Sequence, residues 1–158
     1  MYCSICIVSI VIFMVIMNSD LSRFITAQDP VFNTVRSELS FGRKSSHWMW
    51  FIFPQLKGLG MSSLSEFYGL SGVLEAEAYL HHELLGSRLK EVVSMLLHTK
   101  ETNPEAIFGR TDAMKLRSSL TLFLSVDSSE EQPFKKCLDK FFNGLPDQRT
   151  LALLSQNI

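Results

Sequence analysis

Apolar residues recur with the period of an α-helix along almost the whole sequence. The clearest stretch is residues 83–97, where Leu85, Leu89 and Val92 fall on one stripe. No stretch combines the strict alternation of apolar and polar residues with the tight turns that β-hairpins require. The segment LTLFLSV, residues 120–126, continues the helical phase of the residues before it. The sequence therefore predicts an all-α fold, a single domain of about eight helices.

Residues that favour helix ends divide this pattern into elements. Asn103 stands before Pro104, which suits the first turn of a helix, and Thr111 is placed to cap residues 112–126. Gly144 follows an apolar run and is a typical helix stop. Asp147 is placed to cap a final helix that ends the chain.

Residues 1–17 differ from the rest of the chain because they are apolar throughout and carry no charged side chain. As a helix they would reach about 25 Å, slightly less than the hydrocarbon core of a bilayer. Three interpretations of this segment stay open: a cleaved signal peptide, a membrane anchor, or an upstream extension of a protein whose translation starts at Met17. The next residues favour the extension, since Asp20 can cap a helix. We therefore predict an extension over residues 1–18 and an all-α domain over residues 19–158, cytoplasmic unless residues 1–17 anchor it to a membrane.

The charge balance and the histidines and cysteines exclude several classes of function. Fifteen basic and sixteen acidic side chains give a net charge of -1, which argues against a general nucleic-acid-binding protein. His81 and His82 are adjacent and point about 100° apart on a helix, so they do not form a metal site by themselves. The segment GLGMSS, which contains Gly58 and Gly60, lacks the lysine that a phosphate-binding loop requires. We expect no metal and no cofactor, and Cys137 is interpreted as a core residue.

Both tryptophans lie in one aromatic block, SSHWMWFIFPQ, residues 45–55. From Trp48 to Phe53 the block is apolar on all sides, which favours a short buried helix. Lys44 and His47 border it, and buried indole N–H groups need hydrogen-bond partners. Two interpretations stay open: the block is core alone, or one of Trp48 and Trp50 forms the wall of a ligand pocket.

A second candidate for a site is the helix after Thr111. At 100° per residue, Asp112, Lys115 and Ser119 share one face with apolar residues. Polar groups within an apolar stripe need partners, so this face is the best place for a site. The simpler alternative is an acidic residue in the first turn that forms an ion pair with Lys115.

Together these features predict a pocket for a small anionic or nucleotide-like ligand between the aromatic block and the residue 112–119 helix. The alternatives are an enzyme acting on a nucleotide-like substrate, with Asp112 or His47 as general acid–base, and a protein–protein interaction module. No feature of the sequence fixes an oligomeric state. The predicted ligand-binding residues are Lys44, His47, Trp48, Trp50, Lys115 and Ser119.

The order of several motifs is similar to that of family 1810 of the domains of unknown function, which groups small, mostly bacterial, multihelical proteins. The motifs include SHWMWFIFPQ, DAMKLRSSLTLF and FFNGLPDQRTLALL, and the resemblance runs from about Leu21 to Leu154. It implies a compact helical fold and no particular reaction. Residues 1–16 lie outside the family pattern.

Overall fold

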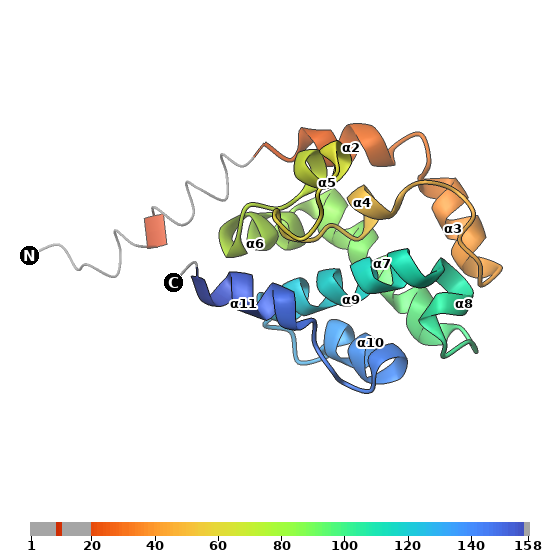
Figure 1. The fold of residues 1–158 in the computed structure, drawn as a ribbon. Helices are drawn as coiled ribbons and strands as arrows, with labels where there is room; N and C mark the ends of the chain where they lie inside the picture. The colour runs from red at the N-terminus through yellow and green to blue at the C-terminus, as the bar shows by residue number, and fades with distance from the viewer. Residues whose placement is uncertain (1–8, 11–19, 157–158) are drawn as a thin grey trace, which may run out of the picture.

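The computed structural model describes residues 9–10 and 20–156, and within residues 20–156 it contains ten helices and no strand (Figure 1). The predicted all-α fold is confirmed. The count of ten in this range exceeds the predicted number of about eight. The helices are α2 (Ser22–Gln28), α3 (Phe32–Ser40), α4 (Met49–Ile52), α5 (Ser63–Tyr68), α6 (Val73–His81), α7 (Glu83–His98), α8 (Pro104–Phe108), α9 (Arg110–Leu124), α10 (Pro133–Phe142) and α11 (Gln148–Gln156).

The longest helix, α7, buries the apolar stripe that its sequence predicts. Leu85, Leu89 and Val92 are almost fully buried. The helix begins after His82, whose Nδ1 accepts hydrogen bonds from the backbone N–H groups of Leu84 and Leu85. This side chain satisfies two of the amides that a helix start leaves without partners. Helix α7 packs against α3, α6 and α10.

Helix α9 packs against α6, α8, α10 and α11 and so connects several parts of the domain. Leu116, Leu120 and Phe123 bury its apolar face, and residues 120–124 are helical as predicted. The predicted cap at Thr111 is wrong, because α9 already begins at Arg110. Gly109, with φ of 75°, separates α8 from α9 and stands at the N-cap position instead.

The loop before α4 is folded around the carboxylate of Glu38, a buried residue of α3. One oxygen accepts hydrogen bonds from the backbone N–H groups of Ser45 (2.9 Å) and Ser46 (3.1 Å) and from the indole of Trp48 (2.8 Å). The other accepts from the hydroxyls of Ser45 and Ser46. Five donors thus converge on one side chain and fix residues 45–48 relative to α3.

The loop after α4 is held by a short parallel bridge between Leu56 and Leu70. The Lys57 N–H donates to the Leu70 carbonyl, and the Leu70 N–H donates to the Gln55 carbonyl, both at 2.9 Å. Buried backbone groups rarely stay unpaired, so this pairing fixes the path of the loop. It places Gln55 beside α9.

Residues 1–8 and 11–19 lie outside the described part of the chain, and with them most of the predicted apolar extension over residues 1–18. Among the described residues, no helix combines the length and the apolar character needed to cross a membrane.

Candidate functional site

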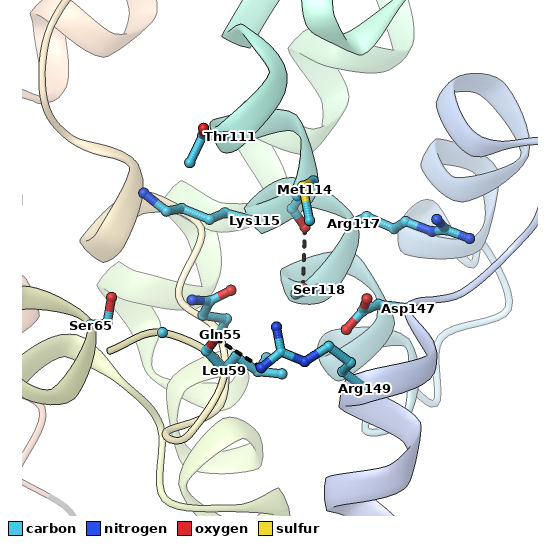
Figure 2. Close-up of a pocket in the computed structure, with 11 residues that line it drawn as sticks. Gln55, Leu59, Ser65, Thr111, Met114, Lys115, Arg117, Ser118, Asp147 and Arg149 are labelled. Atoms are coloured by element: carbon cyan, nitrogen blue, oxygen red, sulfur yellow. Dashed lines mark hydrogen bonds between the residues drawn. The ribbon is translucent and has the colours of Figure 1, made fainter. Parts of the chain in front are cut away.

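A cleft of about 260 Å³ opens between α9, the loop after α4, α5 and the start of α11 (Figure 2). Its walls come from three separate regions of the sequence, brought together because α9 packs against α11 and the loop runs beside α9. The lining residues are Gln55, Leu59, Gly60, Ser65, Thr111, Met114, Lys115, Arg117, Ser118, Asp147 and Arg149.

Three cationic side chains line this cleft, but they are not equally placed. Figure 2 shows Arg149 extending across the cleft toward Gln55 and Leu59, whereas Arg117 extends away from Gln55. The Arg149 guanidinium donates to the Leu59 carbonyl at 3.3 Å, and that of Arg117 donates to the Leu145 carbonyl at 2.8 Å. Within residues 20–156, neither guanidinium forms an ion pair with a carboxylate.

The ammonium of Lys115 lies at the border between the cleft and the aromatic block. Its Nζ is 3.2 Å from Asp112 Oδ1 and 4.3 Å from the centroid of the Trp50 ring. An ammonium over the face of an indole is attracted by the negative potential of the ring. Lys115 therefore joins the two regions that the sequence singled out.

Asp112 lies behind Lys115 and is held by a second ammonium. Lys44 Nζ is 2.7 Å from Asp112 Oδ2, and the Lys44 side chain is only 7% exposed. Burial alone would raise the pKa of Asp112, but the hydrogen bonds and charges of Lys44 and Lys115 outweigh it, so that its pKa lies below the usual value. Asp112 is therefore ionised at neutral pH, and each of its oxygens contacts one ammonium.

The face of α9 that lines the cleft lies next to the face that the sequence predicted for a site. Thr111, Lys115 and Ser118 line the cleft with a spacing of i, i+4, i+7. Ser119 is 1% exposed and does not line it, and its Oγ has no hydrogen-bond partner among the described residues. Asp112 does not line it either. Of the three predicted α9 residues, only Lys115 belongs to the cleft.

The two tryptophans have different surroundings. Trp48 is 1% exposed and belongs to the core, with its indole N–H on Glu38. Trp50 is partly exposed and lines a narrow crevice that it shares with Phe53 and Tyr68. This crevice adjoins the cleft, since Gln55, Ser65 and Lys115 line both. Trp50, rather than Trp48, therefore forms a wall of this crevice.

The remaining predicted site residues are not in the cleft. His47 is exposed and lines neither the cleft nor the crevice. Lys44 also lines neither the cleft nor the crevice, but its ammonium contacts Asp112 Oδ2. The structure thus brings Lys44, Trp50, Asp112 and Lys115 close together. Neither His47 nor Ser119 lines the cleft or the crevice.

Sequence reasoning missed Gln55, Ser65 and Arg149 as cleft residues. Gln55 is the last residue of the aromatic block and Arg149 lies in the final helix, but neither belongs to a polar stripe that signals a site. The three residues come together only through tertiary packing. Asp147 was recognised as a helix cap, and this role is confirmed because its Oδ2 accepts from the Thr150 N–H at 2.9 Å. The available signal was the polar spacing of Thr111, Lys115 and Ser118 on α9.

Among the described residues, no group of three or more His, Cys, Asp or Glu side chains is arranged to hold a metal ion. Cys137 is fully buried, and burial raises the pKa of its thiol to about 12 although Lys140 opposes the shift. A thiol with this pKa is a poor nucleophile. The polar groups of the cleft are cations, hydroxyls, an amide and the carboxylate of Asp147.

Comparison with known proteins agrees with the fold. Residues 18–154 match the model of a family described as a protein of unknown function, DUF1810. The chain belongs to this family. This DUF1810 member is also similar to a solved structure, the conserved hypothetical protein Rv1873 from Mycobacterium tuberculosis. The two share 48% sequence identity with a TM-score of 0.83, over 86% of this chain and 96% of that chain. No curated protein matches the chain.

Proposed function

We propose that this DUF1810 member binds a small anionic molecule in the cleft between α9, α11 and the loop after α4. The observation that carries the proposal is that Lys115 and Arg149, from two different helices, line the same 260 Å³ cleft. Among the lining residues only Asp147 carries a negative charge. Opposed cations around a concave, partly desolvated space favour an anion, because charge interactions are stronger there than in bulk water.

Neutral hydrogen-bond donors of the same cleft support the proposal. The side-chain amide of Gln55 and the hydroxyl of Thr111 lie near the two cations (Figure 2). Amides and hydroxyls supplement charged groups in the recognition of phosphate and carboxylate oxygens. Met114 and Leu59 add apolar surface against which the carbon skeleton of a ligand packs. These groups together fit a small phosphorylated or carboxylated metabolite.

The size of the cleft narrows the class of ligand. Its volume is near the lower end for small-molecule sites, which span roughly 300–1,000 Å³. The crevice beside Trp50 has only about 10 Å³ and does not admit a ring. A nucleotide would therefore place its phosphate between Lys115 and Arg149, with its base toward Met114 and the solvent rather than against Trp50.

Acid–base catalysis by Asp112 or His47 has no comparable support. The carboxylate of Asp112 is held between two ammonium groups, and the resulting low pKa disfavours its use as a proton donor at neutral pH. His47 is exposed and outside the cleft. Binding without turnover is the function that the geometry supports best.

The proposal is tested by calorimetric titration of the purified chain with inorganic phosphate, AMP and a dicarboxylate. We expect at least one of these anions to bind, and Lys115→Gln and Arg149→Gln each to weaken its affinity about tenfold, the scale of one contact charge. Lys90→Gln is the matched control, since Lys90 is an exposed lysine of α7 that lies outside the cleft. Equal affinities of all three variants and the unchanged protein would contradict the proposal, as would no binding of any of the anions.

A further inference from the structure

We propose that Lys44, which does not line the cleft, is a positioning residue that keeps the positive charge of Lys115 available for an anionic ligand. The inference rests on the proposed anion-binding function and adds a residue that would control its strength. It follows from the row of three charged side chains behind the cleft, formed by Lys44, Asp112 and Lys115.

The geometry of this row assigns one carboxylate oxygen to each ammonium. Lys44 Nζ lies 2.7 Å from Asp112 Oδ2, and Lys115 Nζ lies 3.2 Å from Asp112 Oδ1. Two ammonium groups thus share one carboxylate, so the row keeps one net positive charge. The shorter contact belongs to Lys44, which leaves the surplus charge on the side of Lys115 and the cleft.

Lys44 is fixed in place by contacts that do not involve the cleft. Its Nζ donates to the Ser46 carbonyl at 2.6 Å and lies 5.0 Å from the centroid of the Trp48 ring. Its backbone N–H donates to the Ile107 carbonyl at 2.8 Å. Ser46 and Trp48 are in turn held by Glu38. Lys44 is therefore a fixed countercharge that does not move to meet a ligand.

Without Lys44, Lys115 would be the one ion-pair partner left to Asp112 among the described residues. The carboxylate would then neutralise Lys115 and draw its ammonium away from both the cleft and the Trp50 ring. Stability alone is a weak explanation for the row, because buried ion pairs often contribute little net stabilisation compared with apolar residues. Control of the charge that faces the cleft explains why two lysines surround one acid.

The test is a set of four variants titrated with inorganic phosphate, or with whichever of AMP or the dicarboxylate binds the unchanged protein. Lys44→Met should weaken the affinity about tenfold, because Asp112 then neutralises Lys115 and the ligand loses the effect of one charge at contact distance. Lys44→Arg keeps the charge and should bind like the unchanged protein. Asp112→Asn should bind as tightly or more tightly, because Lys115 is then released. The double variant Lys44→Met with Asp112→Asn should recover the original affinity, since it restores one net positive charge.

The recovery in the double variant is the outcome that a purely structural role does not predict. If Lys44 only stabilised the fold, the double variant would bind no better than Lys44→Met. A double variant that stays weak, or a Lys44→Met variant that keeps full affinity, overturns the inference while leaving the proposed function intact. Circular dichroism of each variant identifies any that fail to fold.

A second readout does not depend on any ligand. Fluorine NMR of the protein labelled with 5-fluorotryptophan gives one resonance for each of Trp48 and Trp50, assigned with a Trp50→Phe variant. Lys44 contacts the Trp48 ring and Lys115 contacts the Trp50 ring. Lys44→Met should shift the Trp50 resonance as Lys115 moves toward Asp112, and the shift should be reversed in the double variant. An unmoved Trp50 resonance would overturn the inference even if no anion binds.

Discussion

The indole N–H of Trp48 donates a 2.8 Å hydrogen bond to the carboxylate of Glu38, ten residues earlier in the chain. Both side chains are buried, at 1% and 9% exposure. The same carboxylate accepts from the backbone and hydroxyl groups of Ser45 and Ser46. The carboxylate thus provides hydrogen-bond acceptors for the polar groups that precede the aromatic residues of the block. It also fixes the loop from which Lys44 reaches Asp112.

Glu38→Gln tests how much this carboxylate contributes to the free energy of unfolding. The amide keeps the shape but replaces one acceptor oxygen with a donor, which then faces donors from the loop. We expect a loss of about 3 kcal/mol in the free energy of unfolding, since hydrogen bonds to charged groups contribute about 1.5–3 kcal/mol each. Urea denaturation measures it. Glu130→Gln is the control, because Glu130 is exposed and its side chain forms no hydrogen bond or ion pair with the described residues. Equal stabilities of the two variants would contradict a structural role for Glu38.

The same carboxylate predicts a pH dependence of stability. Burial would raise the pKa of Glu38, but the hydrogen bonds from Ser46, Ser45 and Trp48 outweigh it and lower the pKa from 4.5 to about 2. A carboxyl group with a lowered folded-state pKa stabilises the fold above its unfolded pKa, and this contribution is lost as the pH falls toward the folded value. The stability difference between the unchanged protein and Glu38→Gln should be constant above pH 5 and shrink between about pH 4.5 and 2. A difference independent of pH would be the contrary result.

The two tryptophans should respond differently to truncation. Trp48→Ala should cost about 3–5 kcal/mol, because it opens a cavity in the core. It also leaves the Glu38 carboxylate with one donor fewer. Trp50→Ala should cost about 1–2 kcal/mol, since part of that ring is already exposed. The removal of the ring beneath Lys115 should also change the affinity for anions. Denaturation curves of both variants give the comparison, and equal large losses would make the aromatic block core alone.

Local signals account for what the sequence predicted well. The stripe of α7 and the Asn103 cap, whose Oδ1 accepts from the Glu105 N–H at 3.0 Å, depend on residues within a few positions of one another. Glu38 carries no such signal, because its donors lie seven to ten residues away across a loop. A carboxylate near the end of an amphipathic helix is normally a solvated charge. Its burial follows from the path of the loop, which the sequence pattern does not reveal.

In the candidate site, too, the sequence predicted the local helical pattern, whereas the face that lines the cleft depends on tertiary packing. The helical period of α9 is confirmed. Lys115 lines the cleft, and its role as a site residue stays a prediction. Two neighbouring stripes pass through Lys115, one with Asp112 and Ser119 and one with Thr111 and Ser118. Which of them faces the cleft is decided by how α11 and the loop after α4 pack on α9, because those elements supply the opposite wall.

Ser119 and Thr121, two of the buried hydroxyl residues of α9, differ in their hydrogen bonding. Ser119 Oγ is buried without a hydrogen-bond partner among the described residues. Thr121 Oγ1 donates to the Arg117 carbonyl and accepts from the Asp147 N–H, at 2.8 and 2.9 Å. Ser119→Ala should therefore be neutral or stabilising by up to about 1 kcal/mol, whereas Thr121→Val should cost about 1–3 kcal/mol. Thermal unfolding of the two variants checks the order. A larger loss for Ser119→Ala than for Thr121→Val would contradict it.

The last prediction concerns Lys140, whose ammonium closes the end of α7. Its Nζ donates to the carbonyls of Leu96 (2.9 Å), Leu97 (3.1 Å) and Thr99. The last carbonyls of a helix have no partners within the helix, and the negative end of its dipole attracts a cation. Lys140→Met keeps the length of the side chain but removes the charge and all three donors, so we expect a loss of about 1–3 kcal/mol.

The control is Lys136→Met on α10, the helix that also carries Lys140. Lys136 is exposed, and its side chain forms no hydrogen bond or ion pair with the described residues. This variant should change the free energy of unfolding by less than about 0.5 kcal/mol. Hydrogen exchange adds a local measure: the amides of the last turn of α7 should exchange faster in Lys140→Met, with those of α3 unaffected. If both variants were equally stable and exchanged alike, the contact between Lys140 and the end of α7 would be of no energetic consequence, and α10 would be held to α7 by apolar packing alone.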